Sequence, residues 1–140
     1  MTAIERFLQY VTYGTASDEG SETCPSTPSQ KVLGARLVQD LAEIGMQDAH
    51  MDEDGYVYAF LPATPGRENH KKLGFVAHMD TSPDASGDNV KPRVITYGGG
   101  DITLENGDVV KPADYPFLAE YVGQELIVTD GTTQIGRAHV

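Results

Sequence analysis

The hydrophobic positions in the first third of the chain predict two amphipathic helices. Between Thr2 and Tyr13, apolar side chains recur at the spacing of one helical face, and Thr2 is a suitable N-cap. From Ser29 the same spacing returns and continues to Ile44, where Gly45 is a natural stop. The stretch between the two helices is rich in Gly, Ser, Thr and Pro, and it predicts a long loop.

The pattern then changes from helical to strand-like. Residues 46–63 predict a β-hairpin, with Asp54-Gly55 at its turn and a strand over Tyr56–Leu61. Residues 73–77, with the sequence Leu-Gly-Phe-Val-Ala, form a short uninterrupted apolar run. Such a run is typical of a central strand that is buried on both faces.

The last third of the chain predicts smaller elements. Short strands are expected around Asn106-Gly107, and a helical turn precedes a final strand over Leu126–Thr129. Two amphipathic helices followed by strands and loops predict an α/β layer architecture.

Acidic residues dominate the charge of the 140-residue chain, whose formal net charge is −11. This charge argues against nucleic acid and anionic membrane surfaces as partners. The single cysteine, Cys24, excludes an intramolecular disulfide and fits a reducing cytoplasm. The first residues lack the basic start and apolar centre of a signal peptide, and no apolar run approaches the ~20 residues that span a bilayer.

The candidate chemistry follows residues 73–77 directly, in the sequence His78-Met79-Asp80. Ligands of α/β proteins bind at the carboxyl ends of strands, and side chains at i and i+2 of an extended chain point the same way. Asp80 can therefore hold one ring nitrogen of His78 while the other nitrogen binds zinc. The alternative is a polar cap on the core, followed by an Asx turn at Asp80 that has no chemistry. Spacing alone leaves both interpretations open.

Further motifs extend this pattern along the chain. The run His-x-Asp-Thr-Ser-Pro-Asp spans residues 78–84, and other distinctive segments are IERFLQYVTYGTAS, CPSTPSQ, GYVYAFLPAT, YGGGDITL and GQELIVTDGTT. Together they resemble the peptidase T family, tripeptide aminopeptidases of the di-zinc exopeptidase superfamily. The resemblance implies an α/β fold over residues 1–134, as the amino-terminal part of a zinc exopeptidase catalytic domain with a mixed sheet flanked by helices.

The resemblance also implies a mechanism. In that family, two zinc ions are bridged by an Asp and a water or hydroxide, and a Glu acts as general base while one residue is released from the peptide. By resemblance, His78 ligates one zinc ion, and Asp80 is catalytic because it orients His78. The implied protein is a cytoplasmic hydrolase whose partners are short peptides. Asp84 belongs to the family motif, although solvation in a loop is the default for Asp84 and Asp88.

The carboxyl end departs from the family pattern. The family continues with Ala-Asp-Asp-Lys-Ala-Gly, and its zinc-bridging Asp falls on Ala138 while its second Asp falls on His139. His139 is disfavoured as a substitute ligand because terminal side chains are usually solvated. We expect residues 135–140 to be a non-native tail from truncation, where the reading frame runs from a short DNA insert into adapter sequence.

One His and one carboxylate cannot complete a four-coordinate zinc site. We therefore expect an amino-terminal fragment that binds zinc weakly or not at all and has no peptidase activity. An uncovered apolar sheet face also predicts aggregation or partial folding. Two alternatives remain open: a related acylase or dipeptidase of the same superfamily, and a short non-catalytic binding protein on the same scaffold.

Overall fold

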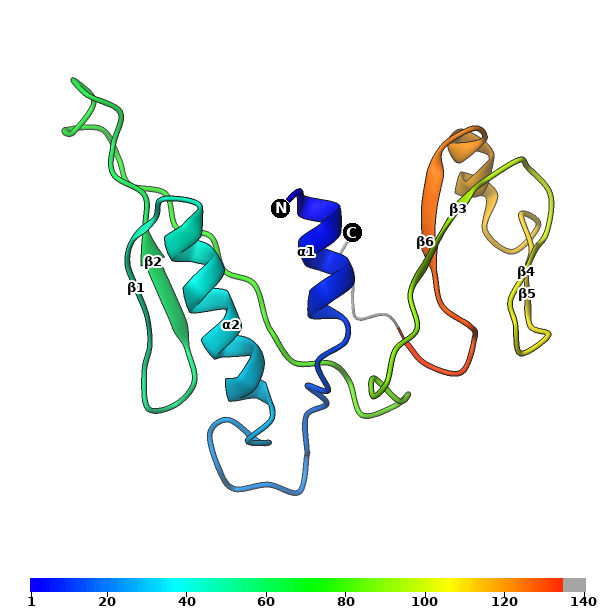
Figure 1. Ribbon diagram of the computed structural model, residues 1–140, viewed down its shortest axis with the longest axis horizontal. Coiled ribbons are helices and arrows are strands. Elements are labelled where there is room, and N and C mark those ends of the chain that lie inside the picture. Colours follow the sequence, from blue (N-terminus) through cyan, green and yellow to red (C-terminus); the bar gives the residue numbers. More distant parts are fainter. Residues whose placement is uncertain (135–140) are drawn as a thin grey trace. The chain divides into compact units, whose positions relative to one another are not determined.

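The computed structural model describes residues 1–134, whose helices and strands are labelled in Figure 1. The chain divides into two compact units. One unit is Thr15–Asp80, and the other combines Met1–Gly14 with the residues from Thr81 onward. The expected non-native tail at residues 135–140, which contains Ala138 and His139, lies outside the described residues.

The unit Thr15–Asp80 consists of a helix packed on a hairpin. The helix α2 (Gln30–Glu43) contacts both β1 (Gln47–Met51) and β2 (Val57–Phe60), which pair antiparallel with His50 opposite Tyr58. The second predicted helix and the predicted hairpin are confirmed.

Glycines allow α2 to end and to approach the hairpin. Gly45 follows the helix with φ of +88°, a left-handed conformation that residues with a side chain rarely adopt. Gly34 lies against the hairpin, where an added Cβ would come 2.5 Å from Met51 Sδ and 3.4 Å from a methyl carbon of Val57. The small residue therefore sets how closely helix and hairpin pack.

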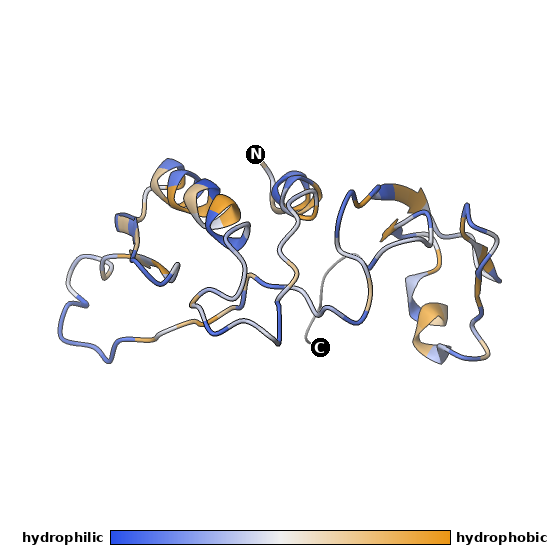
Figure 2. Ribbon diagram, turned by 90° about the horizontal axis from the view of Figure 1, so that it is seen from below, coloured by the Kyte–Doolittle hydropathy of each residue, from blue (hydrophilic) through white to orange (hydrophobic). Residues whose placement is uncertain are grey.

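The helix α1 (Ala3–Tyr10) begins at a complete capping box. The Glu5 amide donates to Thr2 Oγ1 at 3.2 Å, and the Thr2 amide donates to the Glu5 carboxylate at 2.6 Å. These bonds satisfy amides that have no partner inside the first turn. The predicted N-cap is confirmed, and the helix ends at Tyr10 instead of Tyr13. Hydrophilic and hydrophobic residues alternate around both α1 and α2, as in other amphipathic helices (Figure 2).

Short strands and one turn of helix complete the second unit. β3 (Arg93–Thr96) pairs antiparallel with β6 (Glu125–Val128), and β4 (Ile102–Thr103) pairs antiparallel with β5 (Val109–Val110). The 3-10 helix η1 (Pro116–Tyr121) precedes β6. The predicted short strands, helical turn and final strand are confirmed. A small core joins these elements, formed by Tyr97, Ile102 and Leu118 with Ile95, Leu104, Val110 and Leu126 around them.

Two predictions about the sheet are wrong. Residues 73–77 do not form a strand, and Phe75 and Val76 are 92% and 100% exposed. The described strands form three separate antiparallel pairs instead of one mixed sheet. A buried central strand needs a hydrogen-bonded neighbour at each edge and a packed layer on each face. None of the described strands pairs with residues 73–77, so the α/β prediction is confirmed only in its mixture of helices and strands.

Two properties of the chain bear on its environment. Cys24 is a free thiol, and it is exposed. Within residues 1–134, the helices are too short or too polar to cross a membrane.

Candidate functional site

The His78–Asp80 pair lies at the end of the unit Thr15–Asp80, in a segment without regular secondary structure. His78 Nδ1 and Asp80 Oδ1 are 3.0 Å apart. The contact that the i, i+2 spacing predicts is therefore present, although the strand expected to precede it is absent. A carboxylate beside Nδ1 favours the tautomer with its proton on Nδ1, so that Nε2 presents the lone pair.

The pair has little value as a stabilising interaction. Both side chains are 41% exposed, and exposed ion pairs contribute little to the free energy of unfolding. The contact instead restricts the orientation of the His78 ring. That restriction is what a histidine ligand needs from its carboxylate neighbour.

The turn that follows the pair is held by its own side chains. Ser82 Oγ donates to Asp84 Oδ2 at 2.6 Å, and the Asp84 amide donates to Ser82 Oγ at 3.3 Å. The Asp88 amide donates to Ser86 Oγ at 3.3 Å. Asp84 and Asp88 are both exposed. Their solvation in a loop, the default interpretation, agrees with this geometry.

A complete zinc site is absent from the described part of the chain. No group of three or more His, Cys, Asp or Glu side chains within residues 1–134 could hold a metal ion. Zinc requires about four ligands, and the His78–Asp80 pair supplies one nitrogen with its orienting carboxylate. The described residues therefore do not fit a closed zinc site. His139, the substitute ligand that the sequence offers, lies outside them.

The other described histidines have different surroundings. His50 stacks on Tyr58 with ring centroids 5.3 Å apart, and its Nδ1 is 2.7 Å from the Asp48 carbonyl oxygen. His70 is exposed, and its Nε2 lies 3.3 Å from the Arg67 guanidinium. Neither ring has a carboxylate partner of the kind that His78 has.

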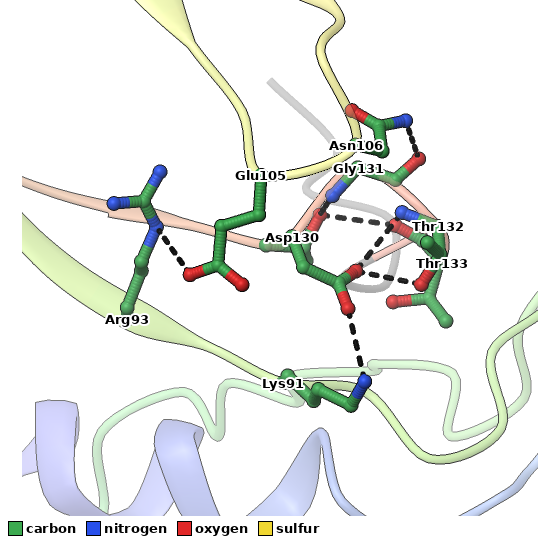
Figure 3. Close-up of polar contacts among 9 residues, drawn as sticks. Lys91, Arg93, Glu105, Asn106, Asp130, Gly131, Thr132 and Thr133 are labelled. Carbon is green, nitrogen blue, oxygen red and sulfur yellow. Dashed lines mark hydrogen bonds and ion pairs between the residues drawn. The ribbon is translucent and has the colours of Figure 1, made fainter.

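A second polar cluster, which the sequence analysis missed, surrounds Asp130 (Figure 3). Its side chain is only 8% exposed. One carboxylate oxygen accepts hydrogen bonds from the Thr132 hydroxyl at 2.6 Å and from the Thr132 amide at 2.9 Å. The other oxygen lies 3.3 Å from Lys91 Nζ. The hydrogen bonds from Thr132, and then the charge of Lys91, lower the pKa of Asp130 from 3.8 to about 2.

The sequence contains only a faint signal for this cluster. Asp130-Gly131 after a strand indicates a turn, in which an Asp side chain commonly accepts the amide two residues ahead. Lys91 contacts the carboxylate and Asn106 contacts the backbone of the loop, and both residues are far from Asp130 in the sequence. Sequence patterns do not predict contacts between residues so far apart in the chain.

Comparison with known proteins gives relatives over nearly the whole chain. No family model matches. The chain is 49% identical over 138 residues to a protein of Parabacteroides distasonis named peptidase T. It is 49% identical over 136 residues to the peptidase T of Clostridium acetobutylicum and 50% identical over 136 residues to that of Geobacillus kaustophilus.

These matches cover 95–97% of the chain. The chain spans only 33–34% of the length of these relatives. The similarity therefore covers almost all of this chain but only about a third of each relative.

Proposed function

This chain is related to peptidase T along almost its whole length, and we propose that it forms part of an aminopeptidase that releases the amino-terminal residue of tripeptides. The alignment with the Parabacteroides distasonis relative covers 97% of this chain, so it spans the His78–Asp80 pair. Residues 1–134 then belong to the amino-terminal portion of the catalytic domain.

The observation that carries the proposal is the 3.0 Å contact between His78 Nδ1 and Asp80 Oδ1. A carboxylate on one ring nitrogen fixes the tautomer and raises the basicity of the other nitrogen. We assign His78 as a zinc ligand through Nε2 and Asp80 as the residue that orients the ring.

Zinc is part of this proposal for the whole protein, with two ions per catalytic domain as in the family that the sequence resembles. The described residues supply one ligand. The zinc-bridging Asp of the family falls on Ala138, and the remaining ligands would come from the two thirds of the relatives that this chain does not cover. The 140-residue chain by itself should therefore bind zinc weakly and should not hydrolyse peptides.

The substrate class follows from the same relationship. The run Thr81-Ser82-Pro83-Asp84 is more specific to the peptidase T branch than His-x-Asp alone, which favours tripeptides over dipeptides or N-acyl amino acids. We propose that the protein is cytosolic, because the one cysteine in this chain, Cys24, is a free thiol.

The proposal is tested in the complete protein encoded by the source gene. Hydrolysis of a tripeptide, a dipeptide and an N-acyl amino acid is measured together with zinc content by mass spectrometry. We expect activity on the tripeptide, loss of bound zinc and activity in His78→Ala, and a decrease of about 10–100-fold in activity in Asp80→Asn.

The matched control is His70→Ala, which removes an exposed histidine without a carboxylate partner and should behave as wild type. Full activity of His78→Ala would contradict the assignment of His78. A wild-type protein that hydrolyses only the dipeptide or the N-acyl amino acid would contradict the substrate class and favour a related acylase or dipeptidase.

A further inference from the structure

Burial of the Asp130 carboxylate requires an explanation, because a buried charge is costly unless it is hydrogen-bonded. Its ion pair with Lys91 is a weak explanation, since the Lys91 side chain is 64% exposed and its charge is screened by solvent. The two hydrogen bonds from Thr132 are shorter, and they come from the same loop. The carboxylate therefore mainly organises the chain that immediately follows it.

That chain is the β6 loop, which we define as residues Thr129–Thr133. Thr129 Oγ1 accepts the Gly131 amide and donates to the Thr133 carbonyl oxygen, each at 3.2 Å. With the bonds from Thr132 to Asp130, these contacts fold the loop onto itself. Hydrogen bonds thus fix its conformation although it belongs to no helix or strand.

The turn between β4 and β5 supports the loop from another side. The Asn106 amide donates to the Asp130 carbonyl oxygen at 2.9 Å, and Asn106 Nδ2 donates to the Gly131 carbonyl oxygen at 2.9 Å. Gly131 has φ of +91°, and an added Cβ would overlap the Asn106 side chain. The backbone of the loop is therefore packed directly against this turn.

The β6 loop leads to the turn that follows the His78–Asp80 pair. The amide of Gln134, the next residue, donates to the Ser86 carbonyl oxygen at 2.9 Å. The Gln134 side-chain amide donates to the carbonyl oxygens of Ser82 at 2.6 Å and Ala85 at 2.7 Å. Gln134, directly after the β6 loop, thus holds this turn at Ser82, Ala85 and Ser86, which lie about fifty residues earlier in the sequence.

We propose that Asp130 is a positioning residue, whose carboxylate sets the conformation of the β6 loop and through it the turn that begins two residues after Asp80. Asp130 does not touch the reacting groups in this role. It acts through Thr132 and Gln134 on the turn that follows the His78–Asp80 pair in the sequence. This inference rests on the proposed function for its effect on catalysis, whereas the bracing of the turn rests on the hydrogen bonds alone.

The bracing is tested in the 140-residue chain by amide hydrogen exchange. Thr132→Val removes the hydroxyl that donates to Asp130 and keeps the backbone amide. We expect the amides of Asn106 and Gln134 to exchange about tenfold faster or more, because a hydrogen bond to a charged group is lost. The Tyr97 amide, which donates to the Gln124 carbonyl oxygen elsewhere in the same unit, should be unchanged.

Thr133→Val is the matched control. Thr133 Oγ1 is buried and, within the described residues, forms no hydrogen bond, so its removal should leave both amides protected. Thr132→Ser keeps the hydroxyl donor and should restore slow exchange. Equal exchange at Gln134 in Thr132→Val and Thr133→Val would overturn the inference.

The catalytic consequence is tested in the complete protein with the same three variants. For a positioning role, Thr132→Val should lower kcat about tenfold or more with little change in KM, and Thr132→Ser should recover it. If Thr132→Val keeps the wild-type kcat while His78→Ala is inactive, the positioning role of Asp130 is overturned and the proposed function is not. Full activity of His78→Ala would instead contradict the proposed function, and the exchange measurement would still decide whether Asp130 braces the turn.

Discussion

At the scale of single residues, Asp130 and Asp80 show two uses of a carboxylate. Asp80 is well exposed and contacts one histidine, so it orients a ring without stabilising the fold. Asp130 is buried and accepts hydrogen bonds from Thr132 and Lys91, so its charge is coupled to the folded conformation. The buried carboxylate of Asp130 should therefore make unfolding depend on pH.

The pKa of Asp130 determines the direction of that dependence. The folded protein lowers this pKa from 3.8 to about 2, so the folded state binds the proton less readily than the unfolded state. The stabilisation is complete above the ordinary value of 3.8 and is lost as the pH falls toward 2. We expect the unfolding temperature, followed by NMR at the Leu118 methyl groups, to fall over this interval less steeply in Asp130→Asn than in wild type.

The control for this measurement is Asp101→Asn. Asp101 is exposed, and it belongs to the same unit of the chain as Asp130. Its substitution removes the same charge without touching the cluster, so the wild-type pH dependence should persist. A similar pH dependence in wild type and in Asp130→Asn would show that the carboxylate is not coupled to folding.

At the scale of elements, α2 packs on both strands of the hairpin in the unit Thr15–Asp80. Two neighbouring residues of the helix differ in burial: Leu33 is buried and Val32 is exposed. Leu33→Ala should lower the free energy of unfolding by about 2–5 kcal/mol, because a core side chain is lost and a cavity remains. Urea unfolding, followed by NMR at residues of β1 and β2, measures this change.

Val32→Ala provides the comparison on the same helix. An exposed valine contributes little packing, and alanine is the better helix former, so the change should lie within about 0.5 kcal/mol of wild type. A loss of similar size in both variants would mean that helix formation, and not packing on the hairpin, dominates the stability of this unit.

Helices, strands and turns whose formation depends on residues close together in the sequence were predictable. Both helices, the hairpin with its Asp54-Gly55 turn, and the short strands follow from apolar spacing, caps and turn residues. Residues 73–77 were mispredicted because an apolar run indicates burial without identifying what buries it. The run is exposed here, and no described strand pairs with it.

The same distinction applies to the two polar clusters. The contact between His78 and Asp80 was predictable because the two residues are only two positions apart. The Asp130 cluster joins Lys91, Asn106 and Thr132, which come from separate loops. Its existence depends on the pairing of β3 with β6 and of β4 with β5, and sequence patterns do not specify such pairings.

At the scale of the whole molecule, exposed apolar side chains and net charge have opposite effects on association between copies of the chain. Large apolar side chains are exposed in both units, among them Phe75 and Val76 in residues 73–77. This segment is apolar, contains the β-branched Val76, and pairs with none of the described strands. Such a segment favours strand pairing between copies. The net charge of −11 keeps copies apart at low ionic strength.

We therefore expect the 140-residue chain to self-associate through residues 73–77, more strongly as salt screens the net charge. Val76→Lys places a charge in the segment and should shift the distribution of species toward monomer in sedimentation velocity experiments at several protein and salt concentrations. Val32→Lys, on the exposed side of α2, adds the same positive charge outside the segment and should associate as the wild type does. Because the two variants have equal net charge, a difference between them assigns association to residues 73–77 and not to overall repulsion. A wild-type chain that stays monomeric at high salt and unfolds in a sharp, cooperative transition would contradict this prediction, since it would mean that the exposed apolar segment is tolerated without a partner.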